Sequence, residues 1–69
     1  MSEQQRADAY AAMYARCVER VTGHTRALLT DAYHGRTDGH DWHAEEIALN
    51  TRRATRILHL EQSRRATRR

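Results

Sequence analysis

The chain has 69 residues, of which 30% are charged and 39% hydrophobic, and its formal net charge is +3. A chain this short forms one domain and buries only about 60% of the surface that its unfolded form exposes, so we expect a marginal core that needs help from a partner. Its single cysteine, Cys17, excludes an intramolecular disulfide. No stretch approaches the about 20 apolar residues of a membrane span. We therefore expect a cytoplasmic protein without membrane contact.

The charge is distributed unevenly along the chain. Residues 1–49 carry five Arg and eight acidic residues, a net charge of −3, whereas residues 50–69 carry seven Arg and only Glu61, a net charge of +6. A basic end of this kind predicts a nucleic acid or an acidic protein as a partner. The alternative is a solvated tail that only keeps the protein in solution. All twelve cationic residues are Arg, a bias of GC-rich codons that favours a high-GC bacterium or its phage as the source.

The first predicted element is a long helix that begins near residue 2. Ser2 and Gln5 have the spacing of a capping box, in which each side chain bonds the backbone N–H of the other residue. Apolar side chains then recur every three or four residues on one face, with His24 occupying one of the positions. These side chains belong to Tyr10, Tyr14, Cys17, Val21 and Leu28. We expect this stripe to pack on the second helix and to bury the Cys17 thiol.

The weakest part of this helix is the segment 22–25, where Gly23 lies between two threonines. A glycine inside a helix costs about 1 kcal/mol relative to alanine. A break here would leave a short helix over residues 26–33 and a fold of three helices. Because the apolar spacing stays in phase across the segment, we predict one continuous helix and keep the three-helix fold as the alternative.

A polar turn follows over residues 34–39. Gly35 is placed for the left-handed end of the first helix, and Asp38 or Asp41 is placed to cap the second. The turn is short, so the two helices must run antiparallel.

The residues around this turn form the nearest approach to a metal site. His40 and His43 have a spacing of three, with His34 and Glu46 close by in sequence. This spacing matches none of the established metal signatures. We interpret these side chains as parts of a polar turn and expect neither a metal nor a cofactor.

The second predicted helix begins near His40 and carries two apolar stripes. The stripe expected to pack on the first helix spans an arc of about 80°. It consists of Ala44, Ile47, Thr51, Ala54 and Leu58. Trp42, Leu49 and Leu60 form the second stripe on the opposite side, among arginines. A simple hairpin does not cover a second stripe, so we predict that these three side chains form a protein interface.

The arginines of this helix are the predicted contacts to nucleic acid or to an acidic partner. The five-residue sequence of 52–56 recurs at 64–68, and a shift of twelve residues turns a helix by about 120° beyond whole turns. The charge is therefore wrapped around the helix, which suits phosphate contacts, and Gln62 is the main candidate for reading a base edge. The predicted contacts are Arg52, Arg53, Arg56, Arg64, Arg65, Arg68 and Arg69.

These observations predict an all-α fold in one domain, residues 1–69, with residues 62–69 as a basic tail that frays. We expect an antiparallel helical hairpin that dimerises through the second stripe into a four-helix bundle. The chain has no nucleophile matched to a base and no phosphate-binding glycine loop, so we do not expect an enzyme. The expected function is a regulator that binds nucleic acid. The alternative is an inhibitor, antitoxin or adaptor that docks on a host protein, with arginines at the rim.

Overall fold

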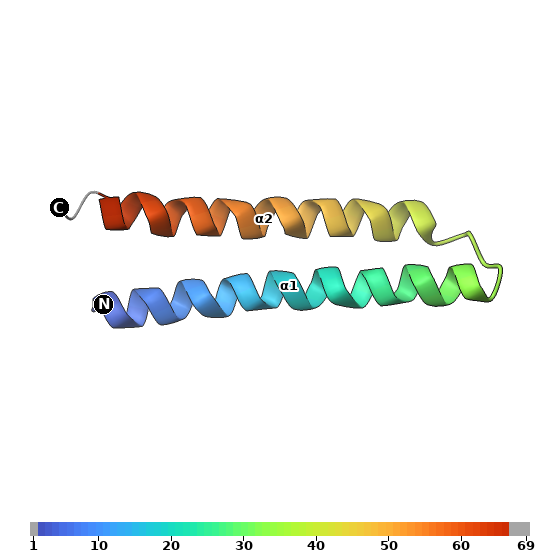
Figure 1. Cartoon of the computed structure of the whole chain (residues 1–69), viewed down its shortest axis with the longest axis horizontal. Helices are drawn as coiled ribbons and strands as arrows, with labels where there is room; N and C mark the ends of the chain where they lie inside the picture. Colours follow the sequence, from blue (N-terminus) through green and yellow to red (C-terminus); the bar gives the residue numbers. More distant parts are fainter. Residues whose placement is uncertain (1, 67–69) are drawn as a thin grey trace.

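The structure is a computed structural model that describes residues 2–66, apart from the side chains of Arg65 and Ala66. Helix α1 (Glu3–Tyr33, 31 residues) and helix α2 (His40–Ala66, 27 residues) lie side by side and antiparallel, in a rod of 53 × 16 × 14 Å (Figure 1). The predicted all-helical hairpin is confirmed. Over the described residues, neither helix is long and apolar enough to cross a bilayer.

The local signals at the start of α1 and at the turn are confirmed. The Gln5 backbone N–H donates to Ser2 Oγ (3.1 Å), and the Ser2 backbone N–H donates to Gln5 Oε1 (2.8 Å), which completes the capping box. Gly35 has a φ of 71°, in the left-handed region that favours glycine. Helix α1 runs through Gly23 without a break, so the three-helix alternative is wrong.

The start of α2 differs from the prediction. Neither Asp38 nor Asp41 caps this helix, because Asp41 lies inside its first turn. The backbone N–H of His40 donates instead to the Thr37 carbonyl oxygen (3.2 Å). A carboxylate in the first turn still interacts favourably with the positive end of the helix dipole.

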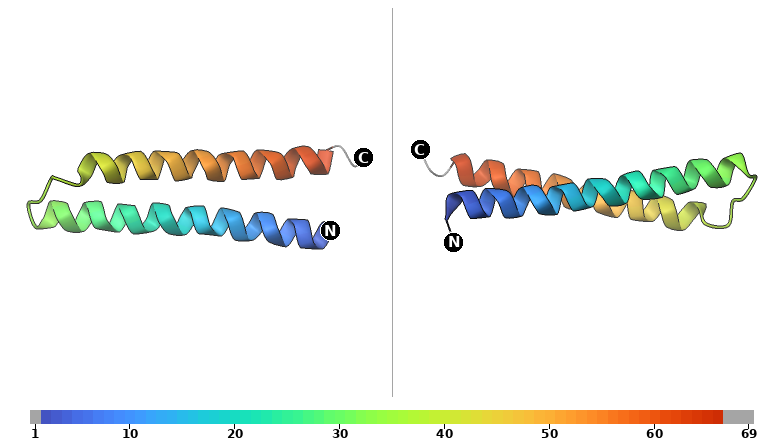
Figure 2. Two further views of the ribbon diagram at one scale, coloured as in Figure 1. Left: turned by 180° about the vertical axis from the view of Figure 1, so that it is seen from behind. Right: turned by 90° about the horizontal axis from the view of Figure 1, so that it is seen from below.

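The two helices meet along a seam with coiled-coil spacing. They cross at a shallow angle when the hairpin is seen from below (Figure 2). Successive seam residues on α2 lie alternately four and three positions apart, which is the pattern of a heptad repeat. These buried or half-buried residues are His43, Ile47, Asn50, Ala54, Ile57, Glu61 and Arg64. On α1 the seam includes Tyr10, Cys17, Val21, His24 and Leu28.

This seam corrects the predicted core stripe of α2. Ile47 and Ala54 are half-buried as expected, but Ala44, Thr51 and Leu58 are exposed. The most buried positions, Asn50 and Ile57, lie between the two predicted apolar stripes. The prediction counted only apolar side chains, whereas the seam also accepts polar ones such as His43 and Asn50. The predicted core stripe therefore lies at one edge of the seam, to which it contributes Ile47 and Ala54, and the second stripe lies beyond the other edge.

The core is small. Among the described residues, the buried apolar side chains are Cys17 and Ile57, and the buried polar one is Asn50. The burial of the Cys17 thiol is confirmed. Asn50 Nδ2 donates to the backbone carbonyl of Glu46 (2.8 Å), while Asn50 Oδ1 is buried without a hydrogen-bond partner. So few buried apolar groups make the hairpin marginal on its own.

Candidate functional site

The residues that lie directly before and directly after the buried positions face opposite sides of the hairpin. The buried Cys17 is preceded by an arginine, Arg16, and followed by Val18; the buried Ile57 is preceded by Arg56 and followed by Leu58. In a helix the two neighbours of a buried residue are turned by about 100° to either side of it. The preceding residues of both helices line one side of the hairpin, and the following residues line the other side.

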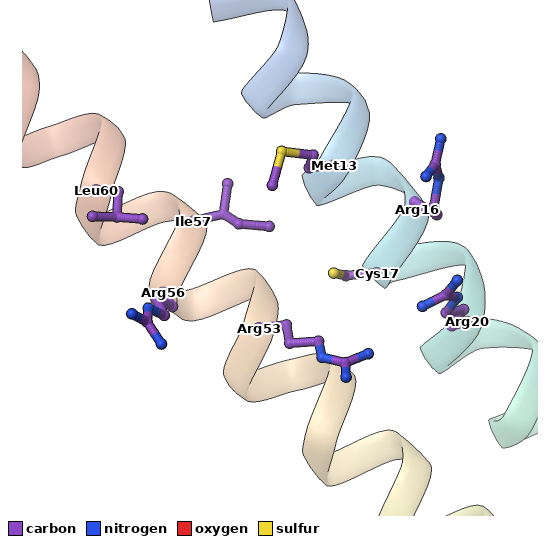
Figure 3. A pocket seen from close by; sticks show the side chains of 8 residues that line it. All are labelled: Met13, Arg16, Cys17, Arg20, Arg53, Arg56, Ile57 and Leu60. Carbon is purple, nitrogen blue, oxygen red and sulfur yellow. The ribbon is translucent and has the colours of Figure 1, made fainter. Parts of the chain in front are cut away.

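The side with the arginines holds a groove of about 340 Å³, which we call the arginine groove (Figure 3). Its floor is apolar, with Met13 and Ile57 pointing toward each other, and Arg53 reaches across from α2 toward α1. The lining residues are Met13, Arg16, Cys17 and Arg20 of α1 and Arg53, Arg56, Ile57 and Leu60 of α2.

The charge of this groove is uncompensated. It has four guanidinium groups, two from each helix, and no carboxylate among its lining residues. Within residues 2–66, none of these four groups lies at ion-pair distance from a carboxylate; the ion pair of Arg36 with Asp31 (3.5 Å) lies at the turn. Guanidinium groups without an acidic partner keep their N–H donors available for an external anion, and their fields add within the groove.

The predicted arginines lie in distinct places in the structure. Arg53 and Arg56 line the arginine groove, and Arg52 lines a neighbouring hollow of about 560 Å³, which Arg56 also lines. Arg64 instead turns toward α1, where its guanidinium carbon lies 5.6 Å from the centre of the Tyr10 ring. The side chain of Arg65 and the whole of Arg68 and Arg69 lie outside the described residues.

Two arginines of the groove, Arg16 and Arg20, were missed by sequence reasoning. Their spacing of four places them on one side of α1, which is a signal that a helical wheel of this helix would have revealed. Their position beside the α2 arginines depends on how the two helices pair.

The second stripe of α2 is exposed along its length. The exposed fractions are 56% for Trp42, 37% for Leu49 and 46% for Leu60. Leu60 lines the arginine groove, while the Trp42 ring lies edge-on to the His24 ring near the turn, with 5.1 Å between the ring centres. The stripe therefore runs on the arginine side of the seam.

The turn histidines do not converge on one point. His43 Nδ1 lies 2.8 Å from His24 Nδ1, so one ring donates a hydrogen bond and the other accepts it. His34 packs edge-on against Tyr33, and Glu46 Oε2 is 3.5 Å from Asn50 Nδ2. His40 Nε2 is buried and has no partner in the described structure. Within residues 2–66, no three His, Cys, Asp or Glu side chains form a group that could hold a metal ion.

No protein-family model matches the chain, and neither the curated proteins nor the solved structures include a match.

Proposed function

We propose that this chain is a small non-enzymatic regulatory protein that binds nucleic acid through the arginine groove and the C-terminal arginines. The observation that carries the proposal is the convergence of four guanidinium groups from two helices on one groove without a carboxylate among the lining residues. A guanidinium group presents five N–H donors in one plane and can bond two phosphate oxygens at once. The groove therefore offers a phosphate backbone more donors than α2 alone.

The amide side chains favour binding without base readout. Asn and Gln are the usual readers of adenine, but Asn50 is fully buried. Gln5 is used in the capping box, and Gln4 Nε2 donates to Asp8 Oδ1 (2.9 Å). Gln62 is left as the exposed amide on α2. We therefore expect recognition of backbone charge and shape, with little preference for sequence.

The direct test is fluorescence anisotropy with labelled duplex DNA, single-stranded DNA and an RNA hairpin, each of roughly 20 nucleotides or base pairs, over a range of salt concentrations. Each phosphate contact to duplex DNA contributes about −0.9 to the slope of log K against log salt. Four groove arginines therefore predict a slope of about −4 or steeper. The absence of binding to all three nucleic acids at low salt would contradict the proposal.

A second candidate function is supported by the apolar floor of the groove. Phosphates need no apolar contact, but Met13 and Leu60 lie exposed among the arginines, and Trp42 and Leu49 continue the stripe toward the turn. An acidic amphipathic helix of a protein partner would place apolar side chains on this stripe and carboxylates on the arginines. The chain would then be an inhibitor, antitoxin or adaptor.

A pull-down with and without nuclease separates the two functions. Loss of all captured material after nuclease treatment favours nucleic acid. A protein that stays bound after nuclease, and is lost when Trp42→Ala and Leu49→Ala are combined, favours the second candidate. Neither position lines the arginine groove, so this double variant should leave nucleic-acid binding nearly unchanged.

We also propose that the hairpin works as a two-fold dimer that forms a four-helix bundle. Support comes from the small core, in which Cys17 and Ile57 are the buried apolar side chains of the described residues. A hairpin of this size gains the missing burial most simply from a second copy. Sedimentation equilibrium at micromolar concentration should give twice the chain mass of 8.0 kDa.

A further inference from the structure

We infer that the second copy packs on the side of the hairpin opposite the arginine groove, through a surface that we call the uncharged face. It consists of Tyr14, Val18 and Thr22 of α1 with Thr51, Thr55 and Leu58 of α2, all of them exposed. The groove between these six residues has no charged residue in its lining. This inference rests on the proposed dimer and is independent of the nucleic-acid proposal.

Two of the three threonines of this face, Thr51 and Thr55, have their hydroxyl groups paired within α2. Thr51 Oγ1 donates to the Ile47 carbonyl (2.7 Å), and Thr55 Oγ1 donates to the Thr51 carbonyl (3.0 Å). Both hydroxyl groups are thus satisfied within α2, so burying them against a partner leaves no donor unpaired. Their methyl groups, like the side chains of Val18 and Leu58, are available for apolar contact. The hydroxyl groups of Tyr14 and Thr22 have no such bond in the described structure, so a second copy must pair them or leave them at the rim of the contact.

The shape of the hairpin sets how a second copy must lie. A standard interface buries about 800 Å² of accessible surface on each partner, so a second copy must lie along most of the 53 Å length of a hairpin that is 16 Å wide. The uncharged character extends along α1, because Ala7, Ala11, Thr25 and Leu29 lie on the same side as Val18 by helical spacing. A second copy covering this face would give the hairpin the burial that its own seam lacks.

The difference in charge favours the uncharged face over the arginine side as the dimer contact. In a two-fold contact the same surface of each copy meets itself. The dimer contact predicted from the sequence, through Trp42, Leu49 and Leu60, lies on the arginine side. It would bring two sets of four guanidinium groups together without acids between them, which like-charge repulsion opposes. The groove at the centre of the uncharged face has no charged lining residue, so no like charges meet there; Glu61 lines the next pocket along this side, toward Ala7. A contact through the uncharged face also leaves an arginine groove open on each outer surface of the bundle.

The test uses two double variants with the same charge change and nearly the same exposure in the hairpin. Val18→Glu with Leu58→Glu places carboxylates on the uncharged face, where the parent side chains are 45% and 44% exposed. Met13→Glu with Leu60→Glu is the matched control on the arginine side, where they are 48% and 46% exposed. Sedimentation equilibrium should give a monomer for the first variant and a dimer for the control and the wild-type chain.

The opposite pattern, a dimeric Val18→Glu/Leu58→Glu variant with a monomeric control, would overturn the assigned face while leaving the proposed dimer intact. A wild-type monomer of 8.0 kDa would overturn both. The nucleic-acid titration is not affected by either result.

A further measurement covers the case in which Val18→Glu/Leu58→Glu unfolds once it cannot dimerise. This variant is mixed with Val18→Arg/Leu58→Arg, so that opposite charges meet across the contact. Recovery of helical circular dichroism together with the mass of a dimer supports the inference, because only a contact between copies can be rescued by mixing. A mixture that stays unfolded would mean that these side chains belong to the hairpin's own core, which would overturn the assigned face.

Discussion

The two sides of this hairpin expose apolar side chains to almost the same extent but differ in charge. Val18 and Leu58 on the uncharged face are as exposed as Met13 and Leu60 on the arginine side. Four arginines surround the second pair, and threonines and a tyrosine surround the first. The comparison teaches that exposed apolar area alone does not identify a partner. In the present account, the surrounding charge directs one side to another copy of the chain and the other side to an anionic ligand.

The packing in the seam fixes the rotation of each helix, and this rotation determines which side chains face each side of the hairpin. Each helix has one buried apolar residue at its centre, Cys17 or Ile57, with an arginine before it and an aliphatic residue after it. A rotation of either helix by one residue step would bring charged and uncharged side chains onto the same side of the hairpin.

The largest effect is expected from Ile57→Ala. Removing a buried isoleucine side chain costs about 2–5 kcal/mol, and this core holds few others. The matched change Leu60→Ala, on an exposed leucine of the arginine side that the inferred dimer leaves open, should cost less than half as much in urea unfolding at the same protein concentration. An equal or larger loss for Leu60→Ala would place the true core on the arginine side and break the comparison.

A smaller effect, of opposite sign, is expected from Asn50→Leu. The buried Asn50 Oδ1 has no hydrogen-bond partner in the described structure, and leaving such a group unsatisfied costs about 1–3 kcal/mol. Leucine at this position should raise the free energy of unfolding by roughly 1 kcal/mol. A buried asparagine in a heptad seam can also specify register, so the variant should give additional peaks in its amide NMR spectrum. Lower stability with a single set of peaks would contradict both expectations.

The smallest effect is expected from Gly23→Ala. Gly23 lies inside α1, and a Cβ added there meets nothing within 4 Å. The change should stabilise the hairpin by about 0.5 kcal/mol in thermal unfolding and leave both sides intact. Gly35→Ala is the control, because a φ of 71° disfavours alanine, and it should cost about 1 kcal/mol. Destabilisation by Gly23→Ala would mean that another chain approaches α1 closely at this point.

The fold could be predicted from the sequence because its signals are local. The capping box of Ser2 and Gln5, the glycine at the turn and the apolar spacing across Gly23 each act within a few residues. The rotation of α2 could not be predicted in the same way. Its apolar residues form two stripes on either side of the seam, and the seam itself includes His43 and Asn50, so a count of apolar residues selects a stripe beside it.

Only the α2 part of the candidate site could be predicted from the sequence, because the rest depends on how the two helices pair. Arg53 and Arg56 could be identified from α2 alone, and they lie in the groove. The contact of Arg64 with the Tyr10 ring could not be predicted from the sequence, because it depends on the antiparallel pairing of the helices. The same pairing brings Arg16 and Arg20 beside the α2 arginines. A groove built from two helices becomes visible only when their relative rotation is known.

If the arginine groove binds nucleic acid, the position of a lost arginine should matter more than the net charge of the chain. Anisotropy titrations of two variants that each lose two positive charges separate these effects. Arg16→Gln with Arg53→Gln removes one groove arginine from each helix, and Arg6→Gln with Arg26→Gln removes two exposed arginines outside the groove.

The groove variant should lose at least about tenfold in affinity for duplex DNA, and its salt slope should become shallower by about 2. The control variant should stay within about threefold of the wild-type affinity and keep the wild-type slope. Equal losses in the two variants would show that net charge alone controls binding and would contradict binding through the arginine groove.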